Sequence, residues 1–253
     1  MQALILAAGV GSRLSSAVDE RPKCLLEFDG VTLLERHIRL LSGTGIGDIT
    51  IVTGYKAELI DKELGKFSNA STRLKTIRNT DYREGSVVSL WTGREVLASG
   101  DDILLMDADV LCSGRIIGAL TNSRHDNCFL LDRDFEPGDE PVKLCINNGR
   151  IVEFRKIIAT NVDFDLQGES VGFFRFSPHG CRLILQQAES YISGDRRDQP
   201  YEEVLRDVVR SAPDMFGYED ISSLPWIEID FPEDIERARC AILPRIRADN
   251  AQG

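Results

Sequence analysis

Long apolar runs, paired cysteines and secretion signals are missing from this sequence, and each absence excludes a class of protein. Its 253 residues contain no apolar run of the roughly 20 residues that cross a bilayer, so we expect no membrane as a partner. The apolar segment at 3–8 lacks a basic flank and is too short for a signal peptide. The six cysteines include no close pair, which argues against a zinc site or a disulfide framework. We therefore expect free thiols and a cytoplasmic location.

Histidine and positive charge are also scarce. The three histidines, His37, His125 and His179, have no serine or cysteine partner at a recognisable spacing, so a nucleophilic triad is not expected. There are 30 lysines and arginines against 41 aspartates and glutamates, which gives a formal net charge of −11. Such a surface repels a polyanion, which argues against nucleic acid as a partner. Any bound polyanion needs a local basic pocket.

Short apolar runs alternate regularly with segments of helical period. This alternation is typical of βαβ units and predicts a mostly parallel sheet. In the first half we expect strands at 2–7, 48–53, 73–78 and 101–106, and helices at 33–41, 56–64 and 87–97. Strands at 128–131, 142–146 and 150–154 follow, with a hairpin turn at 147–149. The rest predicts strands at 170–176 and 226–229 and helices at 178–191, at 201–209 and from 232.

These elements predict a single domain over residues 1–253. A hydrophobic content of 42% with 28% charged residues is ordinary for a soluble globular protein, and no linker or internal repeat divides the chain. We predict an α/β fold with a Rossmann-like, mostly parallel sheet flanked by helices and an inserted mixed β lobe.

A glycine-rich turn follows the first expected strand. Gly9 and Gly11 let backbone N–H groups approach a ligand closely, and such a turn can form an anion-binding nest. With Arg13 and Lys23 close behind, the loop suits a triphosphate. A Walker A loop would need Gly-x-x-x-x-Gly-Lys-Ser/Thr, which is absent, and a dinucleotide fingerprint would need a third glycine in place of Leu14. On spacing alone, a tight turn without a ligand remains an alternative.

Acidic residues end two of the expected strands. Asp107 and Asp109 follow the strand at 101–106, where open α/β sheets bind ligands, and two carboxylates there suit a hard cation such as Mg²⁺. Near the end of the chain, strand alternation puts Trp226, Glu228 and Asp230 on one face. Solvated aspartates in a turn remain the alternative at this point.

The glycine turn resembles a known signature. Residues 6–14 read L-A-A-G-V-G-S-R-L and 21–23 read R-P-K, similar to the signature of the nucleotidyltransferase (sugar-nucleotide pyrophosphorylase) family. The resemblance implies a GT-A-like form of the predicted fold, in which Arg13 and Lys23 hold the phosphates of a nucleoside triphosphate. The residues that would wrap this nucleotide are Leu6, Ala7, Ala8, Gly9, Gly11 and Ser12.

A second resemblance lies near the end of the chain. Residues 226–235 read W-I-E-I-D-F-P-E-D-I and resemble the ending of the phosphocholine, aminoethylphosphonate and inositol-phosphate cytidylyltransferase branch. By this match Asp109 and Asp230 are Mg²⁺ ligands, with Asp107 as a further or alternative ligand. Phe231 stands where threonine is commoner in the branch.

The resemblance extends to the base and to the acceptor. Gly85 and Ser86 correspond to the turn that reads the nucleotide base. The expected acceptor-side residues are Lys143, Lys156, Glu169, Trp226 and Glu228. The candidates to face a cationic head group through a ring are Trp226, Trp91, Phe173 and Tyr201. The carboxylates that could pair with an amine are Glu169, Glu202 and Glu228.

Together the matches predict a CTP-dependent cytidylyltransferase. It would transfer CMP to a small phosphorylated alcohol or phosphonate, of the phosphocholine or 2-aminoethylphosphonate type, and release pyrophosphate. Residues 1–125 would bind the nucleotide and 126–253 the acceptor. An inositol-1-phosphate or sugar-1-phosphate nucleotidyltransferase using CTP, UTP or dTTP stays open, as does a catalytically inactive nucleotide-binding regulatory module. The sequence leaves the oligomeric state open, including a homo-oligomer.

Overall fold

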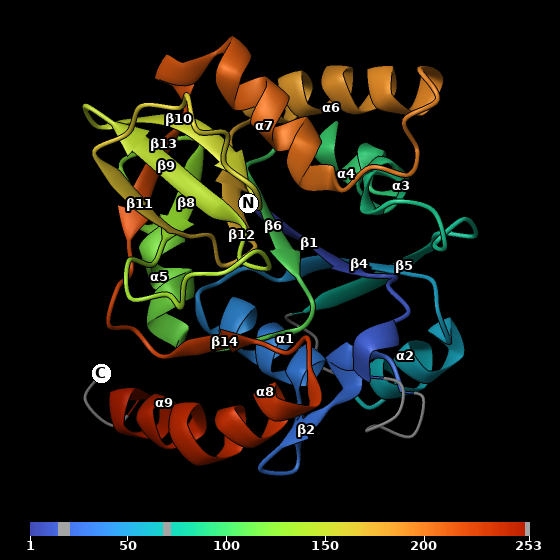
Figure 1. Ribbon diagram of the computed structural model, residues 1–253. Helices are drawn as coiled ribbons and strands as arrows, with labels where there is room; N and C mark the ends of the chain where they lie inside the picture. The colour runs from blue at the N-terminus through green and yellow to red at the C-terminus, as the bar shows by residue number, and fades with distance from the viewer. Residues whose placement is uncertain (15–20, 68–71, 251–253) are drawn as a thin grey trace.

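A seven-stranded sheet runs through the centre of the protein (Figure 1). The computed structural model describes residues 1–14, 21–67 and 72–250, and within them the strand order is β13-β8-β12-β6-β1-β4-β5. The strands are β1 (Gln2–Ala7), β4 (Asp48–Thr53), β5 (Arg73–Arg78), β6 (Ile103–Asp107), β8 (Cys128–Leu131), β12 (Phe173–Phe176) and β13 (Gly217–Asp220). Neighbouring strands are parallel, except that β12 is antiparallel to β6 and β8. The mostly parallel sheet predicted from the sequence is confirmed.

Helices cover both faces of this sheet, as Figure 1 shows. One face packs against α3 (Ser86–Thr92), α4 (Arg94–Leu97), α6 (Pro178–Ser193) and α7 (Tyr201–Ser211). The other face packs against α1 (Leu33–Gly43), α2 (Ala57–Leu64) and α5 (Gly114–Thr121). The apolar positions of α1 recur at helical spacing and are buried, which is the pattern that predicted this helix.

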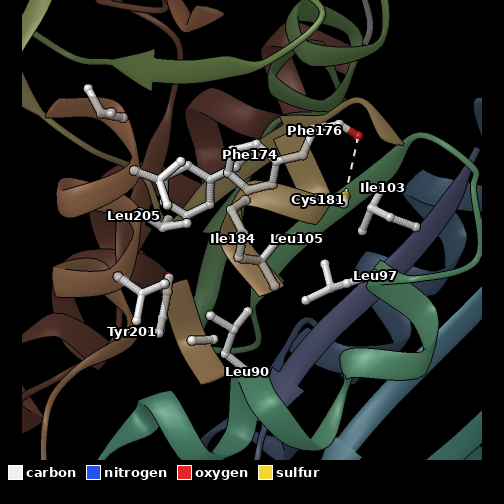
Figure 2. Packing of buried hydrophobic residues seen from close by; sticks show 14 of the residues in the cluster. Leu90, Leu97, Ile103, Leu105, Phe174, Phe176, Cys181, Ile184, Tyr201 and Leu205 are labelled. Atoms are coloured by element: carbon white, nitrogen blue, oxygen red, sulfur yellow. Dashed lines mark hydrogen bonds between the residues drawn. The ribbon is translucent and has the colours of Figure 1, made fainter. Parts of the chain in front are cut away.

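Aromatic and aliphatic side chains pack together in the core beneath α6 and α7 (Figure 2). Phe174 and Phe176 of β12 are fully buried, and the ring centroids of Phe129 and Phe174 lie 5.0 Å apart at an interplanar angle of 75°. Edge-to-face pairs of this kind add to the free energy gained from burial alone. Tyr201, at the start of α7, packs its ring against Phe174 with centroids 6.3 Å apart.

Three smaller sheets complete the fold. The expected β lobe is an antiparallel sheet of β10 (Arg150–Arg155), β9 (Lys143–Asn147) and β11 (Leu166–Glu169), and the predicted hairpin turn joins the first two. A second sheet pairs β14 (Trp226–Glu228) with β7 (Val110–Cys112), and a third pairs β2 (Glu27–Phe28) with β3 (Val31–Thr32). The chain then forms α8 (Pro232–Arg237), the π-helical turn η4 (Ala238–Ile242) and α9 (Leu243–Asn250).

Two predicted elements differ from the structure near a glycine: one strand is shorter than expected, and one helix is interrupted. The strand expected at 170–176 begins only at Phe173, because Gly172 has a φ of 76° and a side chain there would clash with the Asp107 carboxylate. The helix expected at 87–97 is interrupted at Gly93, where a Cβ atom would lie 2.6 Å from Leu4 Cδ2.

The structure also shows the state of the cysteines. All six are free thiols, and all but Cys240 are buried. Among the residues described, no helix combines the length and apolar character that spanning a membrane requires.

Truncation of a core aromatic should destabilise the protein. Phe174 is 0% exposed and contacts several rings, so Phe174→Ala should lower the free energy of unfolding by about 3–5 kcal/mol, measured by chemical denaturation. The matched control is Phe164→Ala, since Phe164 is 38% exposed, and its effect should stay within about 0.5 kcal/mol. Equal losses in the two variants would contradict this account of the core.

Candidate active site

The sheet brings the glycine turn and the acidic turn to the same edge. β1 and β6 are parallel neighbours, with Leu6 opposite Asp107, so the segments after both strands leave the sheet side by side. A cavity of about 750 Å³ lies there. The residues predicted for the site that line it are Leu6, Ala7, Ala8, Gly9, Gly11, Ser12, Arg13, Lys23, Ser86, Asp107, Asp109, Lys156, Glu228 and Asp230.

Gly11 allows Lys23 to approach the turn. Gly11 has a φ of 64°, and a Cβ atom there would lie 3.0 Å from Lys23 Cγ. Lys23 follows Pro22 and begins the short helix η2 (Lys23–Leu25). The glycine is therefore required both by the backbone conformation and by the lysine side chain that passes next to it.

Lys23 lies between two of the predicted metal ligands. Its Nζ donates to Asp109 Oδ2 at 3.0 Å and also to Asp230 Oδ1. Burial alone would lower the pKa of Lys23, but the two carboxylates together raise it well above its usual value. The lysine is thus held in its charged form.

Pairing of β7 with β14 brings Asp230 to Asp109. Glu228 lies opposite Val110, and the Ile229 amide donates to the Asp109 carbonyl oxygen at 3.0 Å. Oxygens of Asp109, Glu228 and Asp230 consequently lie within 4.8 Å of one another, and we call these three residues the carboxylate cluster. Burial raises the pKa of Glu228, and the charges of Asp109 and Asp230 raise it further. The alternation of residues 226–230 predicts that Glu228 and Asp230 share a face, and the resemblance implies that Asp230 meets Asp109. Glu228 was expected on the acceptor side.

Asp107 lies outside the carboxylate cluster. Its Oδ2 accepts a hydrogen bond of 2.7 Å from the Tyr201 hydroxyl. Burial raises the pKa of Asp107 well above its usual value, and Asp109 and Glu202 add to that effect. Tyr201 is not part of the sequence signature, so its contact with Asp107 becomes visible only in the folded chain.

One carboxylate joins two cations at the cavity. Glu140 Oε2 lies 2.9 Å from Arg13 NH1 and 3.2 Å from Lys156 Nζ. Arg13 also contacts Asp230 at 3.2 Å, and its guanidinium carbon lies 5.2 Å from the centroid of the Phe231 ring. The aromatic residue that departs from the branch pattern therefore packs against the arginine. Glu140 lies in a loop without periodic pattern, so no sequence signal predicts its position.

The two residues of the expected base-reading turn differ in their surroundings. Gly85 packs against residues 197–199, where a side chain would clash with the Gln199 carbonyl oxygen, and its amide donates to Arg197 O at 2.7 Å. Ser86 begins α3 and lines the cavity. Its Oγ accepts a hydrogen bond of 2.9 Å from the Tyr201 amide.

The remaining acceptor-side residues lie away from the cavity. Lys143 Nζ donates to Gly138 O at 2.6 Å and to Lys156 O at 2.5 Å. Glu169 and Trp226 line a second cavity of about 410 Å³, which shares Glu228 and Asp230 with the first. Burial and the charge of Asp132 raise the pKa of Glu169 to about 7. The Trp226 indole donates to Asp132 Oδ2 at 2.7 Å.

More than half of the chain matches a known family. Residues 3–159 match the MobA-like NTP transferase domain. The chain belongs to this family. The predicted resemblance and the predicted class of enzyme, a nucleotidyltransferase, are confirmed.

Three of the known proteins similar to this NTP transferase match it over nearly their whole length. A choline-phosphate cytidylyltransferase from Streptococcus pneumoniae is 34% identical over 94% of this chain and 96% of its own. A CTP:phosphoglutamine cytidylyltransferase from Campylobacter jejuni is 22% identical over 93% of this chain and 98% of its own. The solved structure of the inositol-1-phosphate CTP transferase from T. maritima has a TM-score of 0.75 at 20% identity and covers 97% of this chain and 96% of its own. This likeness confirms the predicted fold.

Glu140 should compete with anions that enter the cavity of this NTP transferase. Glu140→Gln removes the carboxylate that pairs with Arg13 and Lys156, so inorganic triphosphate should bind about three- to tenfold more tightly, measured by isothermal titration calorimetry. Glu136→Gln, in the same loop but paired with Arg237 at 3.1 Å, should leave the affinity unchanged. Unchanged or weaker binding by Glu140→Gln would show that the carboxylate does not compete.

Proposed function

We propose that this protein transfers CMP from CTP to a small phosphorylated alcohol or phosphonate and releases pyrophosphate. The observation that carries the proposal is the position of Lys23, which joins the glycine turn to Asp109 and Asp230 in one cavity. The relatives named above, which act on choline phosphate, phosphoglutamine and inositol 1-phosphate according to their names, support CTP as the donor.

The residues of the cavity suit the two anionic substrates. The acceptor oxygen attacks the α-phosphorus of the nucleotide, a new P–O bond forms, and the bond to pyrophosphate breaks. The oxygen is already anionic at neutral pH, so the reaction needs no general base. Arg13 and Lys23 stabilise the charge on the departing pyrophosphate, while backbone N–H groups of the turn at 8–11 position the triphosphate. Ser86 offers its hydroxyl to the base.

The carboxylate cluster fits a Mg²⁺ ion. Three carboxylates with oxygens within 4.8 Å of one another form the all-oxygen donor set that this ion prefers. Asp109 and Asp230, together with Glu228, would hold it, and Asp107 is the alternative ligand. When bound, Mg²⁺ supplies positive charge that offsets the repulsion between the two substrates. Lys23 shares oxygens of the same cluster and therefore competes with the ion.

In this proposal one half of the chain binds the nucleotide and the other half binds the acceptor. Residues 1–125 contribute the glycine turn, Lys23 and Ser86, and 126–253 contribute Lys156 and the acceptor side. The division is not strict, because Asp230 completes the cluster around Lys23. We also infer a cytoplasmic protein that binds neither nucleic acid nor membrane, on the grounds of its net charge and free thiols.

A pyrophosphate-release assay tests the proposal. CTP, UTP, dTTP and ATP are each combined with phosphocholine, 2-aminoethylphosphonate, inositol 1-phosphate and glucose 1-phosphate, and we expect release with CTP. In the same assay Lys23→Ala and Asp109→Ala should each lower kcat by about 10²–10³ or more, with unchanged circular dichroism. Lys66→Ala, on the surface, is the matched control and should keep full activity. Near-wild-type turnover of Lys23→Ala or Asp109→Ala, or activity confined to UTP or dTTP with glucose 1-phosphate, would contradict the proposal.

Metal affinity gives a test that does not depend on turnover. Lys23→Met removes the ammonium group that competes for Asp109 and Asp230, so Mn²⁺ should bind about tenfold more tightly, measured by electron paramagnetic resonance. Asp230→Asn should weaken Mn²⁺ binding, while Asp48→Asn, whose carboxylate pairs with Arg73 on the surface, should not change it. Equal affinities in wild type and Asp230→Asn would exclude the carboxylate cluster as the metal site.

A further inference from the structure

Glu202 lines the main cavity, and the proposed reaction does not use it. It follows Tyr201 in the first turn of α7. Its Oε2 atom is buried and has no hydrogen-bond partner within residues 1–14, 21–67 and 72–250. A buried acceptor atom left unpaired costs free energy, so this oxygen suits a ligand that donates a hydrogen bond.

The wall of the cavity around Glu202 is acidic. Burial raises the pKa of Glu202, and the hydrogen bond from its own backbone amide and the positive charge of Lys156 oppose this only in part. The Lys156 ammonium donates to Glu140 at 3.2 Å, and the Tyr201 hydroxyl is engaged by Asp107. These commitments leave Oε2 of Glu202 without a donor from its neighbours, in a region that favours a cation over a neutral group.

The aromatic residues indicate which kind of cation fits. A quaternary ammonium group has no N–H and is recognised by aromatic faces, whereas a primary ammonium group donates three hydrogen bonds. Trp226 and Phe231 line the second cavity. In the described part of the chain, two aromatic residues line the main cavity: Tyr201 packs its ring into the core, and the guanidinium carbon of Arg83 lies 5.4 Å from the centroid of the Tyr82 ring. Both of these rings thus already have partners, and a carboxylate with an unpaired oxygen beside them matches the primary ammonium group.

We propose that Glu202 is a specificity residue that binds the primary ammonium group of the acceptor, an aminoalkyl phosphate or aminoalkyl phosphonate. The inference rests on the proposed function, because the phosphate end of the acceptor must lie near Lys23 and the carboxylate cluster. Glu202 would then fix the opposite end of the same molecule.

Equilibrium binding tests this assignment without turnover. With Mg²⁺ and a nonhydrolysable CTP analogue present, isothermal titration calorimetry compares phosphoethanolamine, phosphocholine, ethyl phosphate and inositol 1-phosphate. We expect phosphoethanolamine to bind most tightly, and Glu202→Gln to weaken its binding about 10- to 100-fold, to the level of ethyl phosphate. Tighter binding of phosphocholine or inositol 1-phosphate by the wild type would overturn the assignment, and this ranking decides the matter even if the variant fails to fold.

The neighbouring glutamate provides the matched control. Glu203 pairs with Arg155 at 2.7 Å and does not line the main cavity, so Glu203→Gln should keep the preference for phosphoethanolamine. A Glu202→Gln variant that also keeps this preference would overturn the assignment.

Turnover separates this assignment from the proposed function. In the pyrophosphate-release assay, Glu202→Gln should raise KM for phosphoethanolamine far more than it lowers kcat. Amine-selective binding without pyrophosphate release would contradict nucleotidyl transfer while supporting the role of Glu202. Release that is fastest with phosphocholine or inositol 1-phosphate would support nucleotidyl transfer and overturn the role of Glu202.

Discussion

The ammonium group of Lys23 allows carboxylates from two distant segments to share a small volume. Asp109 follows β6, whereas Glu228 and Asp230 belong to the segment of β14, and their oxygens lie within 4.8 Å of one another. Like charges this close repel strongly in a partly buried site. The hydrogen bonds of Lys23 to Asp109 and Asp230 offset that repulsion. The pairing of β7 with β14 brings these carboxylates together, and Lys23 offsets the repulsion that this pairing creates.

Tyr201 connects the hydrophobic core to the polar cavity. Its ring packs against Phe174, its hydroxyl donates to Asp107, and its amide donates to Ser86. One residue thus fixes the start of α7 relative to the end of β6 and the start of α3. Because Glu202 is the next residue along α7, its carboxylate is positioned by the packing of the core. An aromatic residue that is anchored in the core in this way can hold a substrate-binding side chain in place without a dedicated loop.

Local patterns in the sequence were sufficient for much of the fold and for part of the site. Apolar periodicity predicted the strands of the central sheet except β13, and the rule that ligands bind at the carboxyl ends of strands placed Asp107 and Asp109 at the ligand crevice. The resemblance supplied the role of Asp109. The break before β12 was missed, because the conformation of Gly172 depends on the nearby Asp107 carboxylate. Glu140 and the contact of Tyr201 with Asp107 were missed for a similar reason. Both arise where segments far apart in the chain meet, and no short-range pattern encodes them.

Glu140 has a consequence for the kind of anion that the protein retains. Its carboxylate contacts Arg13 and Lys156 at once, so a ligand that replaces it must engage both cations together. Orthophosphate has a single phosphorus centre and spans about the same distance as the Glu140 carboxylate. Its binding free energy is therefore too small to displace that carboxylate. A chain of linked phosphates spans both cations and displaces it by multivalency. Under the proposed function, the Glu140 contacts therefore favour a triphosphate over ions with a single phosphorus centre.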